Sequence, residues 1–162
     1  MQLVSVGSSR GESNFHVVFT PKYRRDVFAD VEVRRMCLES FARTCYDLGI
    51  GLEACEFGPD HVHLFVSGCR NYSVPYMVQR FKGASSHKIR KELWARVRGK
   101  LWGDSFWSDG YFYRSIGSTT TDAVRYYIEN SQGKHWMSRD YEHPQAREED
   151  ERAGGQARLD EF

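Results

Sequence analysis

The amino-acid sequence predicts an α+β fold in which helices pack on one antiparallel sheet. Three observations lead to this prediction. Stretches rich in β-branched and aromatic residues recur along the chain, segments between them carry apolar residues at helical spacing, and a tight Gly-Pro-Asp turn joins the middle two strands. The order strand, helix, strand, strand, helix, strand is the βαββαβ pattern of a ferredoxin-like (RRM-like) sheet, and an additional C-terminal helix follows it.

Length and composition fit one globular domain. The chain has 162 residues, of which 40% are apolar and 14% aromatic, enough to bury a sizeable core. We assign residues 1–13 to a flexible leader, 14–145 to the domain and 146–162 to an acidic, disordered tail. The sequence lacks an apolar run of about eighteen residues, and its start lacks a signal-peptide core, so we expect a cytoplasmic protein without membrane contact.

Residue types also bear on the kind of partner. The four cysteines include no CxxC pair, which favours buried free thiols over a zinc site. The net charge of +1 is uninformative, but its distribution is uneven. Between Gln79 and Lys100 a single acid, Glu92, accompanies a basic series, which indicates a polyanion partner. That series is Arg80, Lys82, Lys88, Arg90, Lys91, Arg96, Arg98 and Lys100.

The first half of the predicted domain begins with a strand over residues 14–20, which are β-rich and end at Pro21. Asp30 can cap a helix that runs to about Leu48, and the following glycine is a plausible stop. Residues 50–57 then form a strand. The next strand begins at His61 after the tight turn, so this pair is predicted to be a hairpin.

The second half has two further helices around one strand. A helix begins near Ser73 or Val74 and runs to about Ile89 or on to Val97, although Gly83 costs it roughly 1 kcal/mol relative to alanine. The aromatic-rich residues 106–117 read as a strand interrupted by a glycine-containing turn. Ser, Thr and Asp residues then offer N-caps for a last helix over about 121–130.

His61 and His63 lie two residues apart in the second strand of the hairpin. Positions i and i+2 of a strand point to the same face, so both imidazoles can aim at one metal ion. Two protein ligands leave open positions, as a catalytic site requires, and a divalent ion there could polarise a phosphoryl oxygen. The alternative is that both are partly solvated polar residues. Asp60 either orients a histidine or caps the turn, and we favour the turn.

The last predicted helix carries two candidate nucleophiles, Tyr126 and Tyr127. A tyrosine hydroxyl titrates near pH 10, so near-neutral chemistry needs a metal, a base or a polarised substrate. Adjacent helical positions point about 100° apart, so the two should not share one role. The alternative is that both are packing residues.

Several segments together carry a family resemblance, in this order along the chain: HVVFTPKYR (16–24), GPDHVHLF (58–65), FKGASS (81–86), LWG (101–103), WSDGY (107–111), SIG (115–117) and YIEN (127–130). The set resembles the single-tyrosine HUH transposases of the insertion-sequence 200/605 family (TnpA type). The resemblance extends from about Phe15 to Gln132, which is most of the predicted domain. The HxH motif alone is weak evidence for this family, whereas the ordered set of segments at family-like spacing is strong evidence.

The resemblance implies an enzyme that cleaves and rejoins single-stranded DNA at transposon ends and recognises subterminal hairpins. It implies that His61 and His63 hold Mg²⁺ or Mn²⁺, and that Tyr127 attacks the scissile phosphate to form a 5′-phosphotyrosine. It also implies a homodimer with composite active sites, in which the tyrosine helix of one subunit completes the metal site of the other.

The third metal ligand departs from the family pattern. The family commonly has a glutamine four residues after the tyrosine, where this chain has Ser131. Gln132 lies at +5, about 140° from Tyr127 in a regular helix, and a loosened turn or π-bulge could bring it round. We favour Gln132 and keep Asn130, at +3, as the alternative. If Tyr126 were the nucleophile, Asn130 would lie at +4.

Six basic residues are candidate DNA contacts: Lys22, Arg24, Arg80, Lys82, Lys88 and Arg90. The four in the second helix could equally form a solvated helix face, and the two after the first strand could simply hold its exit. Two other functions stay open. One is a non-catalytic nucleic-acid-binding protein of the same fold, which the imperfect ligand spacing favours. The other is a related HUH endonuclease that acts on repeat hairpins.

Overall fold

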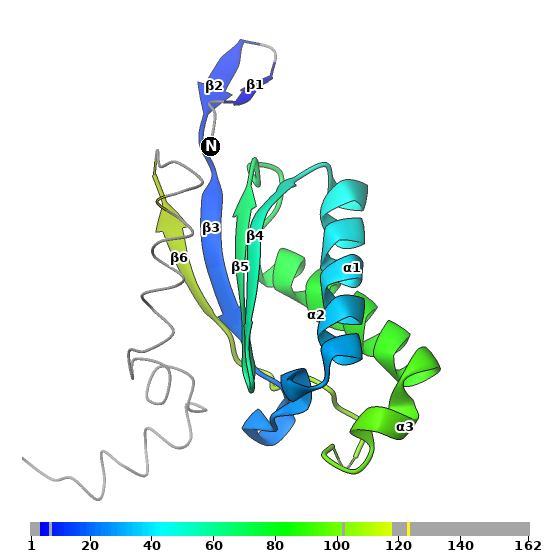
Figure 1. Cartoon of the computed structure of the whole chain (residues 1–162). Coiled ribbons are helices and arrows are strands. Elements are labelled where there is room, and N and C mark those ends of the chain that lie inside the picture. The colour runs from blue at the N-terminus through cyan, green and yellow to red at the C-terminus, as the bar shows by residue number, and fades with distance from the viewer. Residues whose placement is uncertain (1–3, 7, 102, 118–122, 124–162) are drawn as a thin grey trace, which may run out of the picture.

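The computed structural model describes residues 4–6, 8–101, 103–117 and 123. One antiparallel sheet has the strand order β4-β5-β3-β6, and helices α1 and α2 cover one of its faces (Figure 1). The α+β, ferredoxin-like arrangement is therefore confirmed. Its elements are β3 (Asn14–Phe19), α1 (Val31–Leu48), β4 (Gly51–Gly58), β5 (His61–Ser67), α2 (Val74–Glu92) and β6 (Phe112–Ile116).

Both long helices begin where the sequence places their caps. The Asp30 carboxylate accepts a hydrogen bond from the Glu32 amide at 2.9 Å, and Ser73 Oγ accepts one from the Tyr76 amide at 3.3 Å. Helix α1 ends at Gly49, whose φ of 67° suits a residue without a Cβ. Helix α2 stops before Leu93, and a separate short helix, α3 (Trp94–Val97), follows it.

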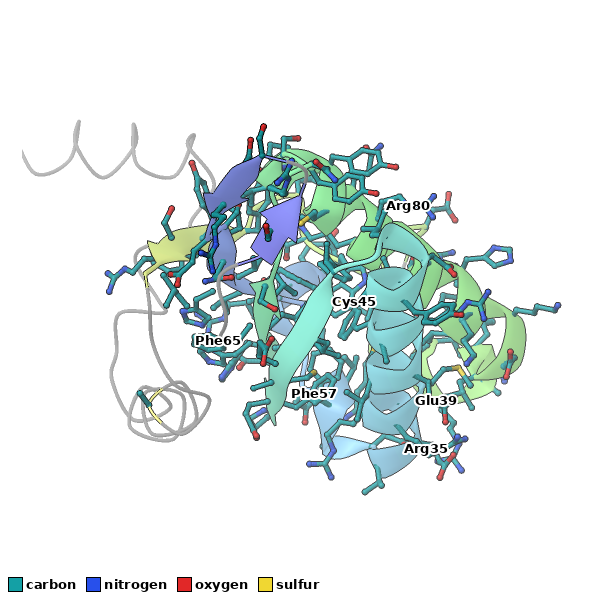
Figure 2. All side chains as sticks on the ribbon, turned by 90° about the horizontal axis from the view of Figure 1, so that it is seen from above. Arg35, Glu39, Cys45, Phe57, Phe65 and Arg80 are labelled. Carbon is teal, nitrogen blue, oxygen red and sulfur yellow. The ribbon has the colours of Figure 1, made fainter. Side chains whose placement is uncertain are left out.

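Strand β5 is buried on both faces. Val62, Leu64 and Val66 point into the main core between the sheet and the helices. Phe65 points to the other face, where it forms a separate apolar cluster with Ala54 and Ile116. Figure 2 shows Phe65 on the side of the sheet away from α1. Two buried faces explain why Leu64 and Phe65 are adjacent apolar residues in a strand that otherwise alternates.

Three segments differ from the expectation or lie beyond it. The leader over 1–13 contains a short hairpin of β1 (Val4–Val6) and β2 (Ser9–Gly11). The strand expected over 106–117 is limited to β6, because the aromatic rings at its start are buried in the main core and do not alternate between two faces. The helix expected over 121–130, apart from residue 123, and the tail over 146–162 lie outside the described residues.

The surroundings of the four cysteines can be compared with the prediction of buried free thiols. All four cysteines are free, as predicted: Cys37, Cys45 and Cys69 are buried, and Cys55 is partly exposed. Burial raises the pKa of the Cys45 and Cys69 thiols to about 12, with a smaller contribution of Cys69 at Cys45. Within the described ranges, no helix combines the length and apolarity needed to cross a bilayer.

Candidate functional site

Three histidines lie on the sheet face that points away from α1 and α2. His61 and His63 come from β5, and His16 comes from the neighbouring strand β3, where it pairs with Phe65. His16 Nε2 lies 2.9 Å from His63 Nδ1, and the two rings stack with centroids 5.2 Å apart. Strand alternation thus does bring His61 and His63 to one face, and the antiparallel register adds a third imidazole.

His61 opens β5 directly after the tight turn. Its Nδ1 lies 2.8 Å from Asp60 Oδ1, and a carboxylate oxygen can only accept here, so Nδ1 carries the proton. The other ring nitrogen, Nε2, is buried and has no hydrogen-bond partner in the part of the chain that the structure describes. The ring lies over Gly58, where any Cβ would overlap it. His61 therefore presents a lone pair from a confined ring.

The rings of His61 and His63 have centroids 5.1 Å apart and planes inclined at 81°. In each ring Nδ1 already has a hydrogen-bond partner, either Asp60 or His16. Nε2 is therefore the nitrogen that each ring retains for an additional ligand. This arrangement, in which one nitrogen is held and the other is offered, is typical of metal-binding histidines.

Burial keeps two of the imidazoles neutral. Desolvation, with smaller contributions from His16 and His61, lowers the pKa of His63 to about 3. Desolvation, with a smaller contribution from Arg114, lowers the pKa of His16 to about 4. A neutral imidazole is the form that binds a metal, so the charge state near pH 7 suits one.

A divalent metal ion fits the donor set. The unpartnered, buried Nε2 of His61 and the neutral imidazoles are what such an ion requires. Among the described residues, no group of three or more His, Cys, Asp or Glu side chains is arranged to hold it. Any further protein ligand has to come from elsewhere. The candidates Tyr127, Tyr126, Gln132 and Asn130 lie outside the described residues.

Asp60 joins the site to the segment after β3. Its Oδ2 accepts from Arg24 Nε at 3.1 Å and lies 3.0 Å from Arg24 Nη2, while its Oδ1 contacts His61. Burial opposes the shift, yet the hydrogen bond with His61 and the charge of Arg24 together lower the pKa of Asp60. The role in turn capping that we favoured for Asp60 was wrong: its two oxygens contact a histidine and an arginine.

The segment that presents Arg24 is a 3₁₀ turn, η1 (Lys22–Arg24), with unusual backbone angles. Tyr23 and Arg24 have φ values of 58° and 49°, in the left-handed region that non-glycine residues rarely adopt. Lys22 Nζ lies 5.7 Å from the centroid of the Tyr23 ring, and 59% of Tyr23 is exposed. Among the six basic residues predicted to contact DNA, Arg24 lies beside the histidines, because it contacts Asp60 and Asp60 contacts His61.

The remaining candidates belong to α2, in the layer on the other side of the sheet. Arg80 is exposed at the surface of the helix (Figure 2). Lys88 forms an ion pair with Glu39 of α1 at 3.0 Å, and the Arg90 guanidinium lies 5.1 Å from the ring centroid of Trp94. Because α2 packs on the face of the sheet opposite to the histidines, the sheet lies between these basic residues and the histidines. The two groups therefore cannot contact the same phosphate.

Lys82 holds a loop in place. Its Nζ donates to the carbonyl oxygens of Ser108, Asp109 and Gly110 at 2.7, 3.1 and 2.9 Å. It also lies 5.6 Å from the ring centroids of Phe19 and Tyr111. Burial lowers its pKa to about 8, against the opposing charge of Asp109. An ammonium has three N–H donors, and all three are used here, which favours a structural role over the predicted DNA contact.

Sequence reasoning missed one residue of the site and misjudged another. His16 carried no role in the sequence prediction beyond its place in a motif, although the ferredoxin-like topology places the first strand beside the HxH strand. That adjacency was the signal that could have found it. For Asp60 the sequence allowed the correct role, but we favoured the other one. An acid directly before a metal-binding histidine is a signal for a supporting hydrogen bond.

Comparison with known proteins identifies the family of this chain. Residues 9–131 match the family described as IS200-like transposases. The chain is 28% identical over 120 residues to the ISDra2 transposase TnpA of Deinococcus radiodurans, a match that covers 74% of this chain and 84% of the relative. It is 27% identical over 128 residues to the transposase for insertion sequence element IS200 of Salmonella typhimurium, with 77% and 83% coverage.

Solved structures show the same fold. A crystal structure of a Deinococcus radiodurans protein described as a candidate transposase matches with a TM-score of 0.64 and 25% identity, over 79% of this chain and 97% of that one. A REP-associated tyrosine transposase bound to a REP hairpin matches with a TM-score of 0.52 and 14% identity, over 85% and 76%. Since the family match spans most of the chain, including the histidine strand, this chain belongs to the IS200-like transposase family.

Proposed function

We propose that this chain cleaves single-stranded DNA at transposon ends and rejoins it, with a tyrosine as nucleophile and a divalent metal ion at the histidines. The observation that carries the proposal is the buried, unpartnered Nε2 of His61 on the same face as His63. Membership in a family of transposases supplies the reaction class. Burial of a polar group without a partner costs free energy, and Nε2 of His61 has no hydrogen-bond partner among the described residues.

The proposed nucleophile is Tyr127. Its hydroxyl oxygen attacks the scissile phosphorus, the bond between phosphorus and the 3′ oxygen breaks, and the released 3′ oxygen takes up a proton. The DNA end stays attached as a 5′-phosphotyrosine. This ester retains the transfer potential of the original bond, so a 3′-hydroxyl can attack it and rejoin DNA without a nucleotide cofactor.

His61 and His63 would hold Mg²⁺ or Mn²⁺, with Gln132 as the proposed third protein ligand. Bound there, such an ion would polarise a phosphoryl oxygen and offset the negative charge that develops on it. The chain's own contribution is to keep the His63 imidazole neutral and to hold Nδ1 of both rings, which leaves Nε2 toward the ligand.

We further propose that the substrate carries hairpins near its ends and that the active form is a homodimer with the tyrosine supplied in trans. One structural neighbour is bound to a REP hairpin, which supports hairpin recognition in this fold. Arg24 lies beside the histidines, whereas Arg80, Lys88 and Arg90 belong to the opposite layer. These two groups suit different parts of a folded DNA: the cleaved strand and the hairpin.

The decisive experiment is covalent trapping. Single-stranded DNA carrying the element's end hairpins is incubated with the protein and Mn²⁺, and the mixture is separated under denaturing conditions. A protein–DNA adduct should form with the wild type and with Tyr126→Phe, its matched control, and should be absent with Tyr127→Phe. Loss with Tyr126→Phe alone would reassign the nucleophile, and no adduct despite demonstrated binding would refute the enzyme.

The last of those outcomes would favour the non-catalytic DNA-binding protein, for which Ser131 at the position of the family's glutamine is the specific observation. The third function, an endonuclease acting on repeat hairpins, is separated by the DNA around the gene. Paired subterminal hairpins that flank the gene indicate a mobile element, whereas dispersed repeats without such flanks indicate the endonuclease.

A further inference from the structure

We propose that Asp60, held by Arg24, is the positioning residue of His61: it fixes the tautomer and the orientation of that ring, so that Nε2 faces the metal position. The metal part of this inference rests on the proposed function. The tautomer part does not, because it concerns the metal-free protein.

The carboxylate of Asp60 bridges two partners with its two oxygens. Oδ1 accepts a hydrogen bond of 2.8 Å from the N–H at His61 Nδ1. Oδ2 accepts a hydrogen bond of 3.1 Å from Arg24 Nε and lies 3.0 Å from Arg24 Nη2. Because each oxygen has its own partner, the carboxylate cannot rotate to serve one partner without losing the other. A neutral imidazole has a single N–H, so placing it on Nδ1 leaves the lone pair on Nε2.

The backbone that leads into Asp60 is held as well. The Phe28 amide donates to the Pro59 carbonyl at 3.1 Å, which ties the hairpin turn to the segment after β3. That segment reaches the turn through Tyr23 and Arg24 in the left-handed region, a backbone that persists only where surrounding contacts hold it. In the same turn, the missing Cβ of Gly58 provides the space that the His61 ring occupies.

A matched carboxylate nearby has a different partner. Asp26, in the same segment, forms an ion pair with Lys100 at 3.0 Å, and among the described residues its carboxylate pairs with that ammonium rather than with an imidazole. Removal of either carboxylate therefore breaks one acid–base pair near the surface. Only the removal of Asp60 also removes the acceptor of His61, so Asp26→Ala is the control for the loss of an ion pair.

The first readout is the tautomer of His61 in the metal-free protein, from long-range proton–nitrogen NMR spectra of the ¹⁵N-histidine-labelled chain. The wild type and Asp26→Ala should show His61 with its proton on Nδ1. Asp60→Ala should shift it toward the Nε2–H form. Asp60→Asn should keep the Nδ1–H form, because its amide oxygen still accepts, and this conservative variant separates hydrogen bonding from mere loss of structure.

The second readout is Mn²⁺ affinity, measured by calorimetry on the same variants with a thermal melt of each. Asp60→Ala should bind Mn²⁺ about ten- to a hundredfold more weakly than the wild type, as expected for a residue that supports a metal ligand. Asp60→Asn should fall between the two, and Asp26→Ala should match the wild type.

The outcomes separate the two proposals. An unchanged His61 tautomer and unchanged Mn²⁺ affinity in a folded Asp60→Ala variant would overturn the positioning role and leave the proposed function intact. If the wild type bound no Mn²⁺ at all, the metal-dependent function would fail, and the positioning role would stand or fall on the tautomer spectra alone.

Discussion

Strand β5 sends Val62, Leu64 and Val66 to one face of the sheet and His61 and His63 to the other, and all five side chains are buried. On the first face the rings and aliphatic chains of α1 and α2 fill the space, so burial itself provides the stability. On the second face burial holds the imidazoles of His16 and His63 neutral, and hydrogen bonds fix the orientation of the rings of His61 and His63. Because successive side chains of β5 alternate between the two faces of the sheet, one strand contributes both to the core and to the candidate site.

The comparison predicts that the two faces fail differently, and a truncation in the helix-facing core should have the largest effect on stability. Phe41 of α1 lies 5.8 Å from both Phe19 and Phe81, measured between ring centroids. Phe41→Ala should lower the free energy of unfolding by about 3–5 kcal/mol in urea titrations. In protein that stays folded, Mn²⁺ affinity should match the wild type. A similar affinity loss to that of Asp60→Ala would show that the faces are not independent.

Acid should destabilise the protein through the histidine face. His16 contacts His63, and Arg114 of β6 lies opposite His16 in the sheet register. The pKa of His16 is about 4 in the folded protein, because of burial and the charge of Arg114, and 6.5 in the unfolded chain. The unfolded chain therefore binds more protons between these values, so the stabilisation is complete above pH 6.5 and is lost as the pH falls. Between pH 7 and pH 5, the wild type should lose about 2 kcal/mol more than His16→Gln in urea titrations. Equal losses would contradict the assignment.

The brace formed by Lys82 should matter for stability and not for DNA. Lys82→Met keeps the length of the side chain but removes three charge-assisted hydrogen bonds to the loop over 108–110, and should cost about 1–3 kcal/mol. The salt dependence of DNA binding should be unchanged. Arg80→Met, at an exposed position of the same helix, is the control and should leave stability unaltered. A shallower salt dependence for Lys82→Met would restore the DNA contact.

A smaller loss of stability than in the helix-facing core, with a clear effect on the site, is expected at Gly58. A Cβ there overlaps the buried His61 ring, which has to turn, so Gly58→Ala should weaken Mn²⁺ binding about tenfold and lower the free energy of unfolding by about 1–3 kcal/mol. Gly83→Ala in α2 is the matched glycine control. Nothing lies within 4 Å of its new Cβ among the described residues, so it should stabilise the helix and leave metal affinity alone. Mn²⁺ calorimetry on both variants tests the pair.

The features that could be predicted from sequence depend on local periodicity. Strand alternation placed His61 and His63 on one face, and the cap at Asp30 placed the start of α1, because neighbouring residues alone decide both. His16 escaped because its role depends on the register between β3 and β5, which no local pattern fixes. The hydrogen bonds of Lys82 could not be predicted, because a run of basic residues does not reveal which of them turns toward a loop more than twenty residues away.

Two buried free cysteines of α1 can report on transient opening of the helix layer. Cys37 and Cys45 lie in α1, and burial raises the pKa of both thiols, so disulfide-exchange reagents react slowly with them in the closed protein. Because Cys55 and Cys69 are also free, the labelling of Cys37 and Cys45 is followed separately by peptide mass spectrometry, and their labelling rate measures how often the helix layer opens. Comparing that rate with and without Mn²⁺ asks whether a ligand at the histidines, on the far side of the sheet, slows the breathing of α1, and no engineered probe is needed.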